Sequence, residues 1–564
     1  MTALGKFVLT LSILGLVGFG AYKWWDRLAP AGLASTPATV SATAPSAPGS
    51  NTASATAPAA TLDDAEFVAA LTSCPILPPP AAYVAKDNII EIELSEYAGY
   101  AGIIVANGGL EPSENSVFFR KHGFKVRIKL SEEESWPALN AGRIAASATT
   151  VDVLTAYCRN FAVIAPVQIG FSRGADGLVV RKEIRRINDL RGKTLVTAQF
   201  TEADFFIRYL TQEAGIAVHL LASPGDTPAP DKVNLLFATD AFAAGDLFLK
   251  DLQKGGNQLA GCITWAPKTT EVVEASEGKA QLLTTNKNLL IIADILIINK
   301  AFAADNPKIV AGLVDGTLEG NRLVRDQPAA HLDLIAKSFK WTRAEASAEL
   351  GKVHLSNLPE NLAFYAGTID SAGSFSGIFS SALLAYGSLI DQPTDAEKYM
   401  APAFLEALQA AGAYAEQRIA IAPIRSTGGG ALEGDPLLTK DIRFLFEPNS
   451  ASLQLNNVEN TKNLESIRRL LQVSPGSTIL LRGHVDNALV DKFRQQGGET
   501  FVRQMALKAM ELSKNRANEI RSVLVSQLKV AAPRLETIGR GWEEPSGTDA
   551  ELNRRVEVQW FTVE

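Results

Sequence analysis

Several polar and aromatic residues follow short apolar segments in the middle of the chain, and their types suit the binding of a small charged molecule. Thr197, Gln199 and Thr201 precede a helical stretch that is predicted to begin near Glu202. The free N–H groups at a helix N-terminus favour anions, so these three side chains are predicted to donate hydrogen bonds to an oxyanion. Arg173 is the predicted charge-assisted partner of the same anion. The other predicted cleft residues are Tyr97, Tyr100 and Trp265 as apolar walls, and Thr149 and Asp240 as polar groups.

Three of these residues also have a purely structural interpretation, which the sequence leaves open. Thr201 has the type and the position of a helix N-cap. Arg173 precedes Gly174 and could be a solvated loop charge. Trp265 precedes an Ala-Pro pair and could serve packing alone.

These residues need a framework, and residues 87–422 alternate between short apolar segments and amphipathic ones. Strands are predicted at 88–94, 125–129, 145–149, 177–180, 194–197, 234–238 and 289–298, with helices that include 135–141 and 204–214. Such alternation is typical of α/β layers with largely parallel sheets. The stretch is too long for one sheet-centred domain, so we expect two lobes with a cleft at the carboxyl ends of the strands.

Five segments of this region carry a likeness to a known family: SEYAGYAGIIVANGGL, FKVRIKL, SWPALNAGRIAASATTVDVL, FSRGADGLVVRK and INDLRGKTLVTAQFTEADFFIRYL. Together they resemble the periplasmic solute-binding proteins of uptake transporters, of the nitrate, sulfonate and taurine group (type II). The resemblance implies a two-lobed fold that binds a small solute, expected here to be anionic, and an ABC permease as a partner. FSRGADGLVVRK is expected to form a hinge-like strand between the lobes.

The last part of the chain predicts a smaller α+β domain. A half-buried strand is predicted over 442–453 from its alternation, followed by an amphipathic helix over 458–473. The predicted order continues with a strand over 477–487, a long helix containing 507–528, a strand and turn over 534–547, and an edge strand over 553–561.

Ordered markers in this part carry a second resemblance: Gly-His-Val-Asp ending at Asp486, Leu-Ser-Lys-Asn-Arg-Ala containing Arg516, and Asn-Arg-Arg-Val starting at Asn553. They resemble the OmpA-like peptidoglycan-binding domain. The resemblance implies that Asp486 and Arg516 hold the diaminopimelate of the peptidoglycan stem peptide. A carboxylate suits its ammonium group, and a guanidinium fork suits its carboxylate. The alternative is an internal salt bridge between the two residues.

Two features depart from that family's pattern. The stretch between Asp486 and Arg516 is longer than usual, and Ala509 occupies a position where asparagine is common. The insertion could reshape the pocket, cover it or recruit a partner, and the sequence does not decide between these.

The N-terminal region differs from the rest. Residues 7–25 form an apolar run that ends in Trp24 and Trp25, which predicts a single membrane-spanning helix, with a cleaved signal peptide as the alternative. The following Ala, Ser, Thr and Pro-rich segment predicts an extended tether. The predicted organisation is an anchor over 1–27, a tether over 28–62, the two-lobed domain over 63–423, a linker over 424–438 and the OmpA-like domain over 439–564. This places one helix in the inner membrane and the bulk of the chain in the periplasm.

Composition and motifs exclude several classes of protein. The chain is 46% apolar and carries a net charge of −7, which is ordinary for a globular protein and unlike a basic nucleic-acid binder. The five histidines lack metal-ligand spacing, and no phosphate loop, dinucleotide fingerprint or nucleophile elbow is present. We therefore expect no enzyme activity, no cofactor and no metal. Cys158 and Cys262 are expected to be buried thiols, with a disulfide bridge between them in an oxidising periplasm as the alternative.

The predicted function is that of a cell-envelope protein that binds peptidoglycan and a small solute, for transport or for sensing. The alternative is a structural tether whose middle domain binds no ligand.

Overall fold

The computed structural model describes Leu62 and residues 66–131, 136–369, 372–421, 436–447 and 450–562. The predicted anchor, nearly all of the predicted tether and most of the predicted linker lie outside the described residues. No helix within the described ranges combines the length and the apolar character needed to cross a membrane.

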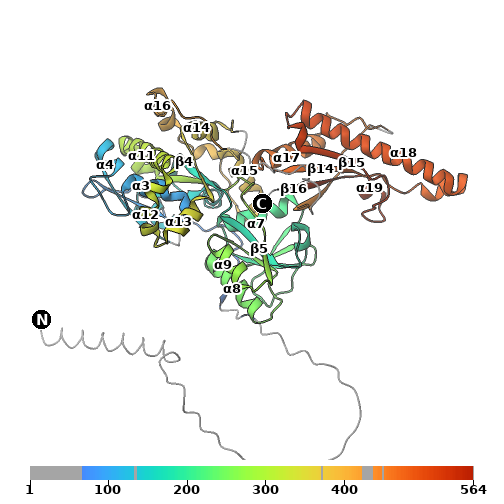
Figure 1. Cartoon of the computed structure of the whole chain (residues 1–564), viewed down its shortest axis with the longest axis horizontal. Helices are drawn as coiled ribbons and strands as arrows, with labels where there is room; N and C mark the ends of the chain where they lie inside the picture. Colours follow the sequence, from blue (N-terminus) through green and yellow to red (C-terminus); the bar gives the residue numbers. More distant parts are fainter. Residues whose placement is uncertain are drawn as a thin grey trace, which may run out of the picture. The chain divides into compact units, whose positions relative to one another are not determined.

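The middle of the chain contains two six-stranded sheets, one in each lobe (Figure 1). The sheet of lobe 1 has the order β12 (Val353–Leu355), β4 (Val163–Ser172), β11 (Ala293–Asn299), β3 (Ala146–Thr150), β1 (Ile89–Leu94), β2 (Lys125–Leu130). The sheet of lobe 2 has the order β10 (Ala280–Thr285), β5 (Asp176–Arg181), β9 (Gly261–Trp265), β6 (Thr194–Thr197), β8 (Val233–Phe237), β7 (Val218–Leu220). The two sheets confirm the prediction of a two-lobed α/β module.

Both sheets are mixed, so the prediction of largely parallel sheets is correct only for part of each. β1 pairs in parallel with β2 and β3, and β6 pairs in parallel with β8 and β9. The antiparallel pairs are β4 with β11 and β5 with β10, among others. The chain leaves lobe 1 along β4 and β5 and returns along β10 and β11, so these neighbours must run in opposite directions. The segment predicted to be hinge-like is the first of these two crossings.

Burial explains the composition of the strands. All seven residues of β11, the apolar run ADILIIN, are buried, as expected for a central strand that is covered on both faces. β2 alternates between buried and exposed residues because it is an edge strand. The helices that cover the lobe 1 sheet include α3 (Ala101–Asn107), α6 (Val151–Ala156), α11 (Pro307–Asp326) and α15 (Phe375–Tyr386), and those of lobe 2 are α7 (Glu202–Glu213), α8 (Ala241–Gln253) and α9 (Lys268–Ala275).

The further helices of lobe 1 are α4 (Val117–His122), α5 (Trp136–Asn140), α10 (Lys300–Asp305), α12 (Pro328–Phe339), α13 (Arg343–Leu350), α14 (Leu358–Ala366) and α16 (Ala403–Ala410). Two short 3-10 helices are η2 (Ala98–Tyr100) in lobe 1 and η3 (Ile187–Leu190) in lobe 2.

The C-terminal part forms a four-stranded sheet in the order β13 (Leu438–Ile442), β16 (Val556–Phe561), β14 (Thr478–Gly483), β15 (Leu535–Gly539). Its helices are α17 (Val458–Val473), the long α18 (Val490–Ser526), which is prominent in Figure 1, and the short α19 (Ala550–Asn553).

Two sequence predictions for this domain are wrong. The predicted strand over 442–453 is a strand only up to Ile442, where β13 ends. Beyond it, Phe446 and Leu453 form an isolated bridge with each other. The predicted edge strand is central, since β16 pairs with both β13 and β14. The prediction of a helix over 458–473 is confirmed.

Candidate functional site

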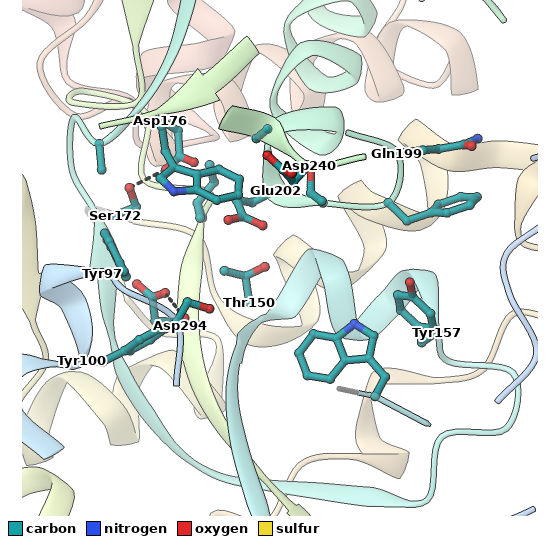
Figure 2. Close-up of a pocket in the computed structure, with 18 of the residues that line it drawn as sticks. Tyr97, Tyr100, Thr150, Tyr157, Ser172, Asp176, Gln199, Glu202, Asp240 and Asp294 are labelled. Carbon is teal, nitrogen blue, oxygen red and sulfur yellow. Dashed lines mark hydrogen bonds between the residues drawn. The ribbon is translucent and has the colours of Figure 1, made fainter. Parts of the chain in front are cut away.

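A cavity of about 210 Å³ is lined by residues of both lobes (Figure 2). Six of the residues predicted from the sequence line it: Tyr97, Tyr100, Gln199, Thr201, Asp240 and Trp265. Tyr97 and Tyr100 come from the start and the end of η2 in lobe 1, and the others from the loops after β6 and β8 and from the end of β9 in lobe 2. The structure therefore brings together residues that are far apart in the chain.

Three predicted residues do not line this cavity: Thr149, Arg173 and Thr197. Thr149 is fully buried in β3, and the next residue, Thr150, lines the cavity instead, because successive side chains of a strand point to opposite faces. The hydroxyl of Thr197 donates to the carbonyl of Ile263 at 3.3 Å. Arg173 lies at the end of β4, where its backbone N–H donates to the carbonyl of Lys352 at 2.8 Å.

The predicted anion donors are committed to the protein itself. The amide of Gln199 exchanges two hydrogen bonds of 2.8 Å with the backbone of Leu71. Thr201 holds the N-cap position of α7, but its hydroxyl donates to the carbonyl of Ala198 at 2.8 Å rather than capping the helix. All three predicted donors, Thr197, Gln199 and Thr201, therefore donate to backbone carbonyls of the protein in this arrangement.

Asp240 and Trp265 have structural contacts as well as a place in the lining. Asp240 caps α8, because its Oδ1 accepts a hydrogen bond of 2.8 Å from the backbone N–H of Ala243. Trp265 ends β9 and packs on Phe242 with ring centroids 5.5 Å apart. The aromatic wall is nevertheless larger than predicted, because Trp136, Tyr157 and Phe200 also line the cavity.

Three carboxyl groups of the lining were not predicted from the sequence: Asp176, Glu202 and Asp294. Asp176 starts β5, and its Oδ2 accepts hydrogen bonds from Ser172 at 2.5 Å and from Asn286 at 3.0 Å. Glu202 is the first residue of α7, and Asp294 lies on β11 of lobe 1. Figure 2 shows these three carboxyl groups around the space that also contains Thr150.

Burial and mutual repulsion make these groups weaker acids than usual. Burial raises the pKa of Asp176 to about 6. Burial, with the charges of Asp176 and Asp152, raises the pKa of Glu202 to about 8. The pKa of Asp294 lies well above its ordinary range for the same reasons, burial first and then Asp176 and Glu202. Asp152, fully buried on α6, has a pKa raised to about 7, chiefly by burial.

One signal in the sequence could have found Asp294. It is the only charged residue in ADILIIN, and a charge inside an apolar strand is costly unless it has a function or a partner. Asp176 and Glu202 carry no such signal, because each stands beside turn residues where an acidic side chain is ordinary.

A second cavity, of about 650 Å³, lies in the C-terminal domain and contains both Asp486 and Arg516. The described residues show no ion pair between these two side chains. Asp486 pairs instead with Arg554 at 3.2 Å. Arg516 donates from Nε to the carbonyl of Ser450 at 3.2 Å, and its guanidinium lies over the ring of Phe446 at 4.9 Å. The alternative of an internal Asp486–Arg516 bridge is therefore not what the structure has.

The insertion forms part of the wall of this second cavity. It supplies Leu489, Phe493, Met505 and Lys508 to the lining. α18 is interrupted at Gly498, whose φ of 64° lies in the left-handed region that favours glycine. The interruption lets Phe493 pack on Phe501, with ring centroids 5.8 Å apart, so the added residues turn back toward the pocket.

The remaining reactive side chains considered are one histidine with two glutamates, and two cysteines. Within the described residues, His484, Glu544 and Glu557 form the one grouping with metal-ligand types, but Arg482 donates to both glutamates at 2.6 and 3.0 Å and balances their charge. Cys158 and Cys262 are free and fully buried, as predicted.

The two-lobed part of the chain is similar to solved structures at low identity. The periplasmic aliphatic sulphonate binding protein SsuA from Escherichia coli is 13% identical with a TM-score of 0.41, over 61% of this chain and 98% of that chain. The alkanesulfonate-binding protein SsuA from Xanthomonas axonopodis pv. citri, bound to MOPS, is 14% identical with a TM-score of 0.41, over 56% of this chain and 100% of that chain. The ligand binding component of an ABC-type import system from Staphylococcus aureus, with zinc bound, is 12% identical with a TM-score of 0.40, over 56% of this chain and 98% of that chain.

The C-terminal domain has a match of its own. Residues 445–559 match the OmpA family, and they include β14, β15, α17, α18 and the cavity with Asp486 and Arg516. This chain therefore carries a C-terminal domain of the OmpA family.

Proposed function

We propose that this chain is a non-enzymatic cell-envelope protein that binds a small solute between its two lobes and binds peptidoglycan through its C-terminal domain. The observation that carries the first part is the cavity itself. It holds about 210 Å³, receives side chains from both lobes, and contains buried polar groups among aromatic rings. Cavities with this mixture are typical of small-molecule sites.

Solute binding would be coupled to movement of the lobes. The lobes are joined by the β4–β5 and β10–β11 crossings, and a ligand that touches both lobes stabilises the arrangement in which they are close. The closed form would then be read by an ABC permease or by a sensing partner. The proposal also keeps the N-terminal anchor over 1–27 in the inner membrane, the tether over 28–62, and the bulk of the chain in the periplasm.

Peptidoglycan binding is supported by the OmpA-family match and by the second cavity. Asp486 and Arg516 lie in one cavity without pairing to each other, so each can meet one charge of a zwitterionic diaminopimelate group. Arg554, which pairs with Asp486, would also face the ligand's carboxylate.

Co-sedimentation of the full-length protein with diaminopimelate-type peptidoglycan tests this part. We expect Asp486→Asn and Arg516→Ala to lose retention, and free diaminopimelate to compete with the wall for the wild-type protein. Asp491→Asn and Arg503→Ala are matched controls, because both residues are exposed on α18. Equal retention of all variants would contradict the assignment of Asp486 and Arg516.

A thermal-shift screen of the full-length protein against small amines, sulfonates, amino acids and alcohols tests the solute cavity. A shift with a ligand class supports solute binding, because a ligand that binds only the folded state raises its stability. No shift with any class would favour the alternative, a structural tether whose middle domain binds no ligand.

A further inference from the structure

The cavity between the lobes is lined by acidic side chains and by no basic one. Asp176, Glu202, Asp240 and Asp294 line it, and among the described residues no lysine, arginine or histidine does so. The Oδ1 atom of Asp240 is engaged in capping α8. Three carboxyl groups therefore remain to face a bound molecule.

These three carboxyl groups come from opposite lobes. Asp294 belongs to β11 of lobe 1, whereas Asp176 and Glu202 belong to β5 and α7 of lobe 2. Asp152 on α6 of lobe 1 is a fourth acidic group in electrostatic contact with Glu202 and Asp294. Like charges that approach one another in a site of low polarity repel strongly. The empty cleft therefore resists closure unless protons or a positive ligand reduce this charge.

Asp294 has a buried oxygen without a partner among the described residues. Asp294 is 2% exposed, and its Oδ1 accepts a hydrogen bond from the hydroxyl of Tyr100 at 3.2 Å. Its Oδ2 accepts none from the described part of the chain. Because a buried carboxylate oxygen without a donor is costly, the site is built for a donor that the protein itself does not supply.

Aromatic rings surround the carboxyl groups. Tyr97 and Tyr100 pack edge to face with centroids 5.2 Å apart, and Trp136, Tyr157, Phe200 and Trp265 complete the aromatic part of the lining. The faces of such rings attract cations, and their apolar surface suits the hydrocarbon part of an organic molecule. A bare metal ion would make no use of these rings.

We propose that the solute is a small organic cation, whose ammonium or guanidinium group is held between Asp294 of lobe 1 and Asp176 and Glu202 of lobe 2. This inference rests on the proposed function, since it names the class of molecule that the same cavity binds. It replaces the sequence-based expectation of an anionic solute. The cation would also act as the bridge that closes the lobes, because it attracts carboxyl groups of both lobes and displaces their protons.

The N-terminus of α7 does not offer an anion site. Glu202 and Asp204 occupy the first turn of α7, and the backbone N–H of Phe200 donates to Oδ2 of Asp204 at 3.1 Å. The chain's own carboxylates thus take the favourable position beside the helix dipole. An added anion would meet these charges as well as Asp176 and Asp294.

Proton exchange gives the inference a distinct signature. Burial, with the charges of Asp176 and Asp152, raises the pKa of Glu202 to about 8, and burial raises that of Asp176 to about 6, so the ligand-free site holds protons near neutral pH. The groups that face them are Asp152 on α6, Asp294 on β11, and Tyr97 and Tyr100 beside η2. A bound cation lowers these pKa values and releases protons, whereas a bound anion raises them and takes protons up.

The test uses full-length protein and probes of matched shape and opposite charge. Ethanolamine is compared with isethionate, and benzylamine with benzenesulfonate and with neutral benzyl alcohol. Thermal shift reports binding, and calorimetry at pH 7 in buffers of different ionisation enthalpy reports the direction of proton exchange. We expect the cations to stabilise the protein and to release protons, and we expect the sulfonates to do neither.

Variants connect the effect to the named residues. Asp294→Asn and Glu202→Gln should each weaken binding of the responding cation by about tenfold or more. The matched control is Asp305→Asn, an equivalent change at an exposed position of lobe 1, which should leave binding unchanged. The two variants replace an acidic group with a neutral one of the same size, so a thermal transition at or above the wild-type value shows that they fold.

The outcomes separate this inference from the proposed function. Stabilisation by the sulfonates with proton uptake would overturn the cationic assignment and leave solute binding intact. Cation binding that Asp294→Asn and Glu202→Gln do not weaken would also overturn it. If none of the probes stabilises the protein, solute binding in this cavity is contradicted. The inference of a cationic solute is then contradicted as well.

Discussion

Asn286 and Asp176 join the two crossings between the lobes. Asn286 lies between β10 and β11, and its Nδ2 donates to Oδ2 of Asp176, at the start of β5, at 3.0 Å. Its Oδ1 accepts hydrogen bonds from the backbone N–H groups of Gly174 at 2.7 Å and of Asp176 at 3.2 Å. The side-chain amide of Asn286 therefore adds three hydrogen bonds between the two crossings, directly beside the acidic cavity.

We predict that Asn286→Ala loosens the connection between the lobes. The substitution leaves two backbone N–H groups without their acceptor and removes one of the two donors to Oδ2 of Asp176, which should lower the free energy of unfolding by about 2 kcal/mol. Hydrogen exchange should become faster in residues 173–177 and 285–292. Asn257→Ala, at an exposed position of lobe 2, is the control, and equal exchange in the two variants would contradict this role.

The acidic cavity predicts that the ligand-free protein loses stability as the pH rises from 5 to 8.5. The pKa of Asp176 is raised to about 6 and that of Glu202 to about 8, with Asp152 and Asp294 facing them. In this range the folded state holds protons that the unfolded state has already released, so the free energy of unfolding falls with pH. The stabilising contribution is complete below the ordinary carboxyl pKa and is lost as the pH passes the raised values.

Glu202→Gln tests the source of this pH dependence. The variant cannot ionise at this position, so its melting temperature should fall less steeply between pH 6 and 8.5 than that of the wild type. Glu271→Gln, on the more exposed surface of α9, should keep the wild-type slope. A slope that Glu202→Gln leaves unchanged would show that other groups dominate.

The close contact between α3 and α11 predicts that a single methyl group added at Gly320 strongly destabilises the protein. A Cβ atom at Gly320 would lie 1.9 Å from the carbonyl oxygen of Gly102, so the helices must separate to admit it. We expect Gly320→Ala to lower the free energy of unfolding by roughly 3 kcal/mol. Gly351→Ala, where the nearest atom would be 3.1 Å away, should cost clearly less in the same denaturant titration.

Arg534 should be essential to the stability of the C-terminal domain. Its guanidinium donates to the carbonyls of Leu471, Ser474 and Ser477 at 2.6 to 2.9 Å, and so ties the start of β15 to the end of α17. Arg534→Met keeps much of the apolar contact but leaves these acceptors unpaired, which should cost about 3 kcal/mol. Faster hydrogen exchange at the end of α17 is the expected readout, and unchanged protection would contradict it.

The insertion predicts an effect on binding to the cell wall. Phe493 lines the second cavity and packs near Trp542, with ring centroids 6.2 Å apart. Phe493→Ala should reduce retention by peptidoglycan several-fold while leaving the melting temperature nearly unchanged, because the ring contributes to the wall of the pocket and not to the core. Retention equal to that of the wild type would mean that the insertion has another role.

The sequence alone indicated most of the elements and the class of the middle and C-terminal parts. Local patterns depend on neighbouring residues, so the apolar segments, the helix over 458–473 and the family markers around Asp486 and Arg516 could be found without coordinates. The hinge-like segment and the buried thiols of Cys158 and Cys262 also follow from local pattern and residue type. Where the prediction concerned pairing, as for β16, it failed, because the place of a strand in a sheet depends on residues far away in the chain.

Only the tertiary structure decided what the cavity contains. Asp176, Glu202 and Asp294 are separated by many residues, and the sequence gives no reason to place them together. The return of the chain along β11 brings Asp294 of one lobe opposite the carboxyl groups of the other. The same packing engages Gln199 and Thr201 in internal hydrogen bonds. Residue types could suggest an anion site, but charge depends on which groups the fold gathers within a few ångströms of each other, and here these groups are acidic.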